Sequence, residues 1–475
     1  MKSSVTQTVE LAGALAAVLG ADAVLTEPAQ LDGYTADTYW PALHARAAGT
    51  PLGRPDVVAV PRTEDDVAAI LRLAGEHRVP VVAWGGGSGT QGAAVPVRGG
   101  IVVDLRALDA IVAIDEVSMT VTAQAGVNGN ALERALNERG LMLPHYPASS
   151  EWATVGGYVA ARGSGVLSTR YGKIEDLVLG LRVALPDGTL FDSLPTPRHA
   201  AGPDLTPLFV GSEGTLGIIT QATLEVVPLP AERSFAAVRF PDVAAGVNAF
   251  RRALARGNRP SVIRMYDEEA TRRVFAPVVG EDLDGVVAVL AFEGGEPSVV
   301  AAERAATLEH ARTEGARELD PALGEAWWDH RYDFYKPPHH PELPSVWGTI
   351  DVVARYRDIH AVHAALKTAV RDRYAPDGLQ LRMHFSHWYR WGTMIYARFL
   401  IPDGGPDALA LHDRIWHDGV TAVLAAGGVM NDHHGVGLKL APFMAAQHGA
   451  GLHALHSVKA SLDPHGIMNP GKLGL

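Results

Sequence analysis

The amino-acid sequence predicts an α+β protein with more than one domain. The chain has 475 residues, which is long enough for about three domains at ~150 residues each. Apolar residues make up 47% of it and charged residues 20%, so it can bury a sizeable core. Short β-branched runs and helical patterns alternate along the chain, and their texture changes near residue 231, after Pro228 and Pro230.

The elements of the N-terminal half can be assigned in order. Residues 1–50 are expected to form a helical strap, and Val57–Val60 is a β-branched run that predicts a strand. Thr63 and Asp66 fit a capping box at the start of the helix that follows. Pro80–Trp84 predicts the next strand. Further elements are expected as a strand at 101–105, a hairpin at 111–115 and 119–123, and a helix from about Asn130 to Glu138.

The C-terminal half is expected to mix helices and strands without a repeat. Strands are expected at 286–292, 348–353 and 393–400, and a helix at 411–426. The last segment, Leu462–Lys472, is rich in turn-forming residues.

Charge and cysteine content exclude several classes of protein. The net charge of −12 argues against a nucleic-acid partner, whose phosphates need a basic face. The absence of cysteine excludes disulfides, thiolate zinc sites, iron–sulfur clusters, a cysteine nucleophile and a cysteinyl flavin. No apolar run reaches the ~18 residues of a transmembrane segment, and Leu11–Gly20 lacks the features of a signal peptide. We therefore expect a soluble, cytoplasmic protein without a transmembrane segment.

Three glycine-rich clusters lie at residues 85–92, 154–172 and 211–217, each beside a β-rich run. Glycines let backbone N–H groups approach phosphate oxygens, because no Cβ blocks them. Any one cluster alone is more simply explained as a tight turn. The three together indicate a site for one extended ligand with a pyrophosphate and a long polar tail.

The first cluster does not fit the dinucleotide site of a Rossmann fold. Gly87, Gly89 and Gly92 match its fingerprint formally, but that fingerprint must open a helix. Here Ala93–Pro96 follows instead, and no acidic residue ends a second strand in the expected place. A Walker A motif is absent as well.

Four motifs follow one another along the chain, namely Trp84–Gly92, Thr154–Gly165, Ile174–Val178 and Gly211–Thr220. Together they resemble the FAD domain of the vanillyl-alcohol-oxidase/PCMH flavoprotein superfamily. His433–Gly437 and Leu462–Lys472 are similar to the C-terminal domain of FAD-linked oxidases. The resemblance covers roughly residues 50–475, which is nearly the whole chain.

Within this superfamily the chain is most similar to the alkyl-glycerone-phosphate synthase branch. The similarity is carried by Thr154–Gly157, Arg162–Gly165, Tyr171–Asp176, Arg264–Met265, Ser386–Gly392 and His433–Gly437. The His-x-Gly-Asp-Gly-Asn-x-His metal block of the D-lactate and glycolate dehydrogenases is missing, and Ser386–Tyr396 takes its place. Asp432 departs from the synthases' three consecutive histidines, and Arg390–Gly392 replaces a small acidic stretch where substrate is expected to bind. These departures weaken the synthase interpretation.

The resemblance implies a fold of four segments. They are the helical strap at 1–50, a two-subdomain PCMH-type FAD-binding domain at 51–230, a substrate-binding cap domain at 231–410, and a C-terminal segment at 411–475 that returns to the flavin site. The cap is expected to be built on an antiparallel sheet flanked by helices.

FAD is the implied cofactor, and three groups of residues are expected to hold it. The pyrophosphate group is Gly85, Gly86, Gly87, Ser88, Gly89 and Gly92. The group beside the ribityl chain and the ring is Thr154, Gly156, Gly157, Ser164 and Gly165. The group along the adenosine half is Glu213, Gly214 and Ile219. Some relatives attach FAD through a histidine in the first glycine loop, but this loop has none, so we expect non-covalent FAD.

The implied catalytic residues are Tyr396, His433 and His434. The two histidines are candidate bases, because an imidazole titrates near neutrality, and Asp432 can orient one of the rings. A structural pair of histidines in a turn is the alternative. Tyr396 matches a family tyrosine near the flavin, and an ordinary strand aromatic is an equal alternative for it.

The implied substrate-binding residues are Arg264, Arg331, His387 and Tyr389, together with Asp432. Arginine suits this role because its planar fork binds a carboxylate bidentately. A surface arginine is the alternative, and it suits Arg331 better than Arg264. His384 with His387 and His339 with His340 have the spacing of metal ligands. No adjacent ligand set completes either pair in the sequence, so we expect no required metal.

These features lead to two enzymatic hypotheses. The first is an FAD-dependent oxidoreductase that oxidises a 2-hydroxy acid or related alcohol by hydride transfer to flavin N5. The second is an alkyl-glycerone-phosphate synthase-like transferase, which exchanges an acyl for an alkyl group through a flavin adduct with no net redox change. A non-enzymatic flavin-binding protein is disfavoured by the retained tyrosine, arginines and histidines. The expected partner is a small anionic substrate, and the electron acceptor and oligomeric state stay open, a homodimer being one option.

Overall fold

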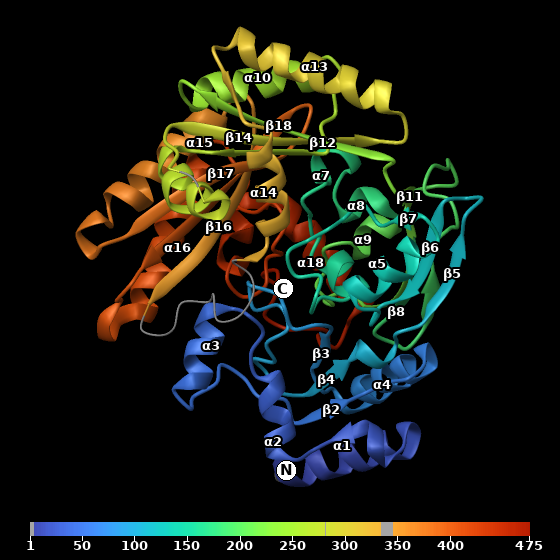
Figure 1. The fold of residues 1–475 in the computed structure, drawn as a ribbon. Helices are drawn as coiled ribbons and strands as arrows, with labels where there is room; N and C mark the ends of the chain where they lie inside the picture. The colour runs from blue at the N-terminus through green and yellow to red at the C-terminus, as the bar shows by residue number, and fades with distance from the viewer. Residues whose placement is uncertain (1–3, 281, 334–344) are drawn as a thin grey trace.

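Two lobes make up the computed structural model, which describes residues 4–280, 282–333 and 345–475. Figure 1 shows the segments before residue 230, in blue to green, which form the cofactor lobe. Beside them lies a lobe of yellow and orange segments, here called the cap. The last helix, α18 (Ala450–Leu462), returns to the first lobe, where its Val458 and Leu462 pack against the second sheet's core. The architecture is α+β with a PCMH-like division into a cofactor lobe and a cap, as the sequence predicts.

The first sheet of the cofactor lobe is mainly parallel. Its strands lie in the order β1 (Val24–Leu25), β2 (Val57–Ala59), β4 (Ile101–Asp104) and β3 (Val81–Trp84). Only β1 is antiparallel to its neighbour. The helix α4 (Glu64–His77) connects β2 to β3, and it begins with the predicted capping box between Thr63 and Asp66.

The second sheet of the cofactor lobe is antiparallel. Its order is β5 (Ile111–Asp115), β6 (Thr120–Gln124), β10 (Ile218–Glu225), β8 (Val178–Ala184) and β9 (Leu190–Asp192). The predicted hairpin is confirmed as β5 and β6, and the predicted helix as α5 (Gly129–Asn137). A short pair, β7 (Leu141–Met142) with β11 (Val227–Pro228), closes this lobe before the chain enters the cap.

A seven-stranded antiparallel sheet forms the cap. Its order is β15 (Arg317–Leu319), β12 (Glu232–Phe240), β14 (Val286–Gly294), β13 (Val262–Tyr266), β17 (Gln380–Trp388), β18 (Gly392–Ile401) and β16 (Val346–Arg355). Helices on one face complete the largest apolar core; they are α10 (Val243–Ala255), α13 (Pro297–Thr313), α15 (Ile359–Leu366) and α16 (Ala408–Ala425). The boundary expected at residue 410 falls inside α16, which packs with the cap.

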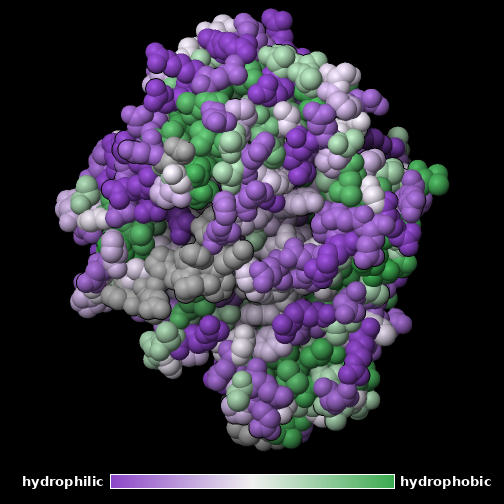
Figure 2. Space-filling model, viewed as in Figure 1, coloured by the Kyte–Doolittle hydropathy of each residue, from purple (hydrophilic) through white to green (hydrophobic). Residues whose placement is uncertain are grey.

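The N-terminal strap joins the two lobes. Leu11 and Leu15 of α1 (Ser4–Leu19) pack into the core of the first sheet. Trp40, at the start of α3 (Trp40–Ala47), lies in the core of the cap. Among the described residues, none of the helices combines the length and the apolar character that crossing a bilayer requires. Figure 2 shows a mainly hydrophilic face with scattered apolar side chains.

Candidate active site

A cavity of about 330 Å³ lies between the two lobes. The cofactor lobe lines it with residues from all three glycine clusters, and the cap lines it with side chains of its sheet. The predicted site residues that line it are Gly85, Gly86, Gly87, Ser88, Gly89, Thr154, Gly156, Gly157, Ser164, Gly165, Glu213, Gly214, Ile219, Arg264, His387, Tyr396, His433 and His434. Gly92, Arg331, Tyr389 and Asp432 lie outside its lining.

The glycines that line the cavity differ in what surrounds them. A Cβ on Gly86 would lie 1.9 Å from the carbonyl oxygen of Trp152, so the protein's own packing requires this glycine. A Cβ on Gly89 would come no closer than 3.6 Å to any atom, and one on Gly157 no closer than 3.4 Å. Packing therefore does not explain the last two glycines, whereas the close approach of a ligand does.

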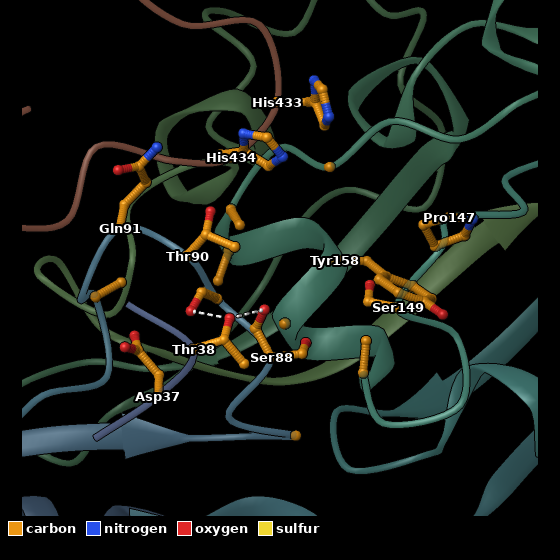
Figure 3. A pocket seen from close by; sticks show the side chains of 18 of the residues that line it. Asp37, Thr38, Ser88, Thr90, Gln91, Pro147, Ser149, Tyr158, His433 and His434 are labelled. Atoms are coloured by element: carbon orange, nitrogen blue, oxygen red, sulfur yellow. Dashed lines mark hydrogen bonds between the residues drawn. The ribbon is translucent and has the colours of Figure 1, made fainter. Parts of the chain in front are cut away.

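Unpartnered polar groups mark the same wall of the cavity. The Thr90 hydroxyl and the Gln91 side-chain oxygen are buried without a hydrogen-bond partner among the described residues. Thr38 of the strap donates to the carbonyl oxygen of Ser88 at 2.9 Å, which holds the glycine loop in place (Figure 3). Open glycines, free polar groups and an extended cavity fit a dinucleotide such as FAD.

The alternation of side chains along the cap strands decides which of them form the cap's wall of the cavity. Asp351 on β16 pairs with Tyr396 on β18, and Tyr396 pairs with His384 on β17, so these three side chains form one row. The rings of His384 and Tyr396 stack with centroids 4.7 Å apart. Arg398, two residues beyond Tyr396, shares the face and lines the cavity. Burial raises the pKa of Tyr396, so its hydroxyl stays protonated at neutral pH.

The segment 431–437, here called the histidine loop, contacts this row at Asp351. Nδ1 of His434 lies 2.7 Å from Oδ1 of Asp351, and Nδ1 of His433 lies 3.1 Å from Oδ2 of Asp432. Oδ2 of Asp351 also accepts the backbone N–H groups of Asp432 and His433. Figure 3 shows both histidines beyond the glycine loop that carries Thr90 and Gln91. The loop is thus anchored to the cap sheet through Asp351.

The two adjacent histidines have opposite protonation preferences. Burial, followed by the charge of His434, lowers the pKa of His433 to about 4. Burial would also lower the pKa of His434, but the Asp351 carboxylate outweighs it and raises that pKa above its ordinary value. His433 is therefore neutral near pH 7, whereas His434 keeps its proton to a higher pH than an ordinary histidine. Environments that push two neighbouring pKa values apart are typical of acid–base pairs.

Asp432 organises the residues around His433. It accepts hydrogen bonds from Nδ1 of His387 at 2.9 Å and from the hydroxyl of Tyr389 at 2.9 Å. Burial would raise the pKa of Asp432, but Lys173 and the histidines hold it well below its usual range. Tyr389 thus contacts Asp432 instead of the cavity. Ser164 of the second glycine cluster lies 3.1 Å from Nδ1 of His387 and joins this network to the cofactor lobe.

The two predicted arginines lie in different places. Arg264 on β13 lines the cavity, and its Nε is buried without a partner among the described residues. Arg331 packs on the ring of Trp328 at 3.8 Å and beside Tyr332 at 4.9 Å. Tyr332 lines the cavity and Arg331 does not, so any influence of Arg331 on a ligand passes through its neighbours.

Two further expectations need correction. Arg390–Gly392 forms the turn between β17 and β18, and none of its residues lines the cavity. Trp391 is 55% exposed there, so the replaced stretch is a surface turn. Gly92 also lies outside the cavity lining; its φ is +79°, and a Cβ would lie 2.8 Å from the ring of Tyr39.

Metal-ligating side chains come together in a way that the sequence did not indicate. Asp432 and His433 lie beside His387, and Asp351, His433 and His434 form a second such group. Neither group includes His384, so among the described residues the pair of His384 and His387 is not completed. Each contact is also an ordinary hydrogen bond between a histidine and a carboxylate, so the expectation that no metal is required stays a prediction. His339 and His340 lie outside the described residues.

Several residues of the site were not anticipated. They are Asp351, Arg398, His384, Lys173 and His145. His145 is fully buried at the cavity wall, and neither ring nitrogen has a partner among the described residues. Burial lowers its pKa to about 3, so the ring is neutral. A charged or polar residue inside an otherwise apolar predicted strand, such as Asp351 in 348–353, was the available signal.

Comparisons with known proteins identify the two lobes. Residues 55–193 match the FAD binding domain family, and residues 229–473 match the C-terminal domain of FAD linked oxidases. The chain is 30% identical to an alkyldihydroxyacetonephosphate synthase from Trypanosoma brucei brucei, over 88% of this chain and 73% of that protein. It is also 30% identical to the uncharacterized FAD-linked oxidoreductase YgcU from Escherichia coli K12, over 96% of each. A mitochondrial D-lactate dehydrogenase from Arabidopsis thaliana is 28% identical over 88% of this chain and 73% of that protein.

Solved structures support the same assignment. An alkyldihydroxyacetonephosphate synthase superposes with a TM-score of 0.80 at 25% identity, covering 97% of this chain and 84% of that one. The fold is also that of p-cresol methylhydroxylase, with a TM-score of 0.79 at 19% identity over 99% of this chain and 97% of that one. FAD is thus the cofactor of this protein. The chain belongs to the FAD-linked oxidase family of flavoproteins.

Proposed function

We propose that this protein is an FAD-dependent oxidoreductase that oxidises a 2-hydroxy acid or a related alcohol with an anionic group. The observation that carries the proposal is the pair of adjacent histidines with opposite protonation preferences, placed in the cofactor cavity with two arginines. Bound FAD supplies an acceptor for the hydride. The protein's own residues must supply a base, an anion site and a dry environment.

His433 is the proposed base for the substrate hydroxyl. Its Nδ1 faces the carboxylates of Asp432 and Asp351, so this nitrogen carries the ring proton and Nε2 has a free lone pair. A neutral imidazole held in one tautomer can accept the proton of the substrate hydroxyl, while the hydrogen on the carbon that bears this hydroxyl leaves as hydride. The alcohol becomes a carbonyl compound, and His433 keeps the proton until solvent removes it.

Three cations are the proposed anion site. His434 favours its protonated form, and Arg264 and Arg398 line the cavity on either side of the His384–Tyr396 pair. A guanidinium binds a carboxylate or phosphate through two parallel hydrogen bonds, so it also orients the group. An anion held there places the neighbouring carbinol carbon near the base. Tyr396, whose hydroxyl is protonated, is proposed to donate a hydrogen bond to the substrate oxygen.

Reduction of the bound flavin by a panel of 2-hydroxy acids tests the proposal. The purified holoprotein is mixed anaerobically with acids of both configurations and different chain lengths, one of them with a second carboxylate. The matched control is the neutral alcohol of each acid. We expect at least one acid to bleach the visible flavin absorbance and its neutral control to do so more slowly. If no member of the panel bleaches the flavin, the proposal is wrong.

An alkyl-glycerone-phosphate synthase-like transferase is the second candidate. It is favoured by the 30% identity to the trypanosomal synthase and by the cavity position of Tyr396. Such an enzyme would exchange the fatty acid of an acylated phosphate substrate for a fatty alcohol without any electron acceptor. Release of labelled fatty acid that depends on added fatty alcohol would establish this reaction and exclude the oxidase proposal as the main activity.

A further inference from the structure

Three residues of the cofactor lobe hold the histidine loop and the residue that follows it; they are Lys173, Gln91 and Glu213. Lys173 donates from Nζ to the backbone oxygen of Asp432. The backbone oxygen of Gln91, in the first glycine cluster, accepts the N–H of Leu438 at 2.8 Å. Glu213, in the third cluster, makes the remaining attachment. The loop that carries the proposed base is therefore held from both sides, by Asp351 of the cap and by the cofactor lobe.

Both carboxylate oxygens of Glu213 take part in this attachment. Oε2 accepts the backbone N–H of Gly437 at 2.8 Å, and Oε1 accepts that of Val436. The backbone oxygen of Glu213 accepts a hydrogen bond from the side chain of Asn469 at 2.6 Å, so the C-terminal tail meets the same point. The residue is 6% exposed and lines the cofactor cavity. The expectation that it lies along the adenosine half thus omits its contact with the histidine loop.

The attachment of the loop to the cofactor lobe also explains why positions 435 and 437 are glycines. A Cβ on Gly435 would lie 2.3 Å from Oε1 of Glu213, and one on Gly437 would lie 2.1 Å from the backbone oxygen of Gln91. Both have positive φ values, +77° and +50°, which glycine adopts without strain. The loop can approach the cofactor lobe this closely only because these two positions lack side chains.

We propose that Glu213 is a positioning residue that couples cofactor binding to the placement of His433 and His434. The segment that carries Glu213 lines the cavity in which FAD would bind, and Glu213 holds the backbone N–H groups of Val436 and Gly437, shortly after the two histidines. A carboxylate accepts both N–H groups, whereas an amide accepts one and turns its own N–H₂ toward the other. The variant Glu213→Gln therefore removes half of the attachment while it keeps the shape of the side chain.

Hydrogen–deuterium exchange of the holoprotein tests the coupling without any substrate. We expect the amides of Val436, Gly437 and Leu438 to exchange at least tenfold faster in Glu213→Gln than in the unmodified protein, with the dissociation constant of FAD changed less than threefold. Glu225→Gln, on the exposed end of β10, is the matched control and should change neither quantity. Removal of FAD from the unmodified protein should accelerate the same amides.

A second variant approaches the contact from the other partner. Gly435→Ala places a methyl group against Glu213 and should accelerate the same amides, which keeps the proposal testable if Glu213→Gln does not fold. Unchanged exchange in a folded variant would overturn the proposal. Loss of FAD from Glu213→Gln with unchanged loop exchange would show a simple cofactor ligand instead.

The kinetic readout depends on the proposed function, whereas exchange does not. With a substrate from the bleaching panel, Glu213→Gln should lower kcat by 10- to 100-fold and leave KM within about threefold. Replacement of a residue that only stabilises the fold would lower the yield or the melting temperature, without a fall in kcat at nearly constant KM. If no substrate is found, the exchange result still decides the coupling.

Discussion

Oδ1 of Asp351 lies 2.7 Å from Nδ1 of His434. Asp351 stands on β16, directly opposite Tyr396 on the neighbouring strand β18. Through Oδ2 the same carboxylate accepts the backbone N–H groups of Asp432 and His433. One residue of the cap therefore fixes the histidine loop and raises the pKa of one of its rings.

The variant Asp351→Asn should lower the pKa of His434, because the carboxylate that raises this pKa is removed. The raised pKa of His434 keeps its charge below that pKa and loses it as the pH rises through it. Without the carboxylate this loss moves to lower pH. We expect kcat/KM for an anionic substrate to fall roughly tenfold or more at neutral pH, because a hydrogen bond to a charged group contributes about 1.5–3 kcal/mol. The pH profile of kcat/KM measures the shift.

Asp65→Asn is the control for this change, because Asp65 is exposed on the first turn of α4, away from the cavity. Equal pH profiles for Asp351→Asn and the unmodified protein would show that His434 is not the titrating group.

The variant His433→Gln should remove the base and leave the cofactor in place. We expect the rate constant of anaerobic flavin reduction to fall by about 10²- to 10⁴-fold, the range of general-base catalysis. In the unmodified protein the pKa of about 4 keeps His433 neutral above that pH, so the rate should fall as the pH drops through about 4. Stopped-flow absorbance measures both, and the exposed His448 provides the control His448→Gln. A reduction rate that His433→Gln leaves unaltered would assign the base elsewhere.

Replacement of the arginines should weaken binding of anionic substrates selectively. A hydrogen bond to a charged group contributes about 1.5–3 kcal/mol, so Arg264→Met or Arg398→Met should raise KM by roughly 10- to 100-fold. KM for the neutral alcohol should change little. Arg317→Met, on the exposed edge strand β15, serves as the control. Steady-state kinetics with both substrates decide the matter, and an equal loss for both would mean that the arginines hold the fold or the cofactor.

Local sequence patterns predicted much of the fold and one wall of the site. The capping box of α4 and the hairpin β5–β6 involve neighbours in the chain, so propensity and periodicity suffice to find them. The three glycine clusters together predicted one shared ligand site, and the family resemblance implied which ligand it is. The sequence did not indicate Asp351 as a site residue, because its partner His434 lies 83 residues further on. Only the register of the cap sheet brings the two together.

The same reason explains the misplaced candidates. Tyr389 and Arg331 stand in segments that border the site, but their side chains turn to Asp432 and Trp328. A motif locates a segment, whereas the direction of each side chain depends on the turn and the strand pairing around it. Trp391 is exposed because it sits at the tip of the β17–β18 turn, which sequence spacing alone did not place relative to the cavity.

The cofactor should leave the protein on denaturation. The chain has no cysteine, and the first glycine loop has no histidine that could attach a flavin. Acid or heat precipitation should therefore release all yellow colour into the supernatant, where its absorbance can be compared with that of the native holoprotein. Colour retained in the washed pellet would demonstrate a covalent bond and redirect the search to other side chains of the cavity.

Two glycines of the first cluster should respond differently to the same substitution. In Gly86→Ala the methyl group would lie 1.9 Å from the carbonyl oxygen of Trp152, a contact that backbone movement must relieve, so folding should suffer. In Gly89→Ala the nearest atom is 3.6 Å away, so the melting temperature of the FAD-free protein should stay within about 2 °C. The new methyl group would project into the cavity that Gly89 lines, and the dissociation constant of FAD should rise at least tenfold. Thermal unfolding and flavin titration measured on both variants separate a glycine that the protein's packing requires from one that the cofactor requires. A Gly89→Ala variant that binds FAD as tightly as the unmodified protein would place the cofactor away from this loop.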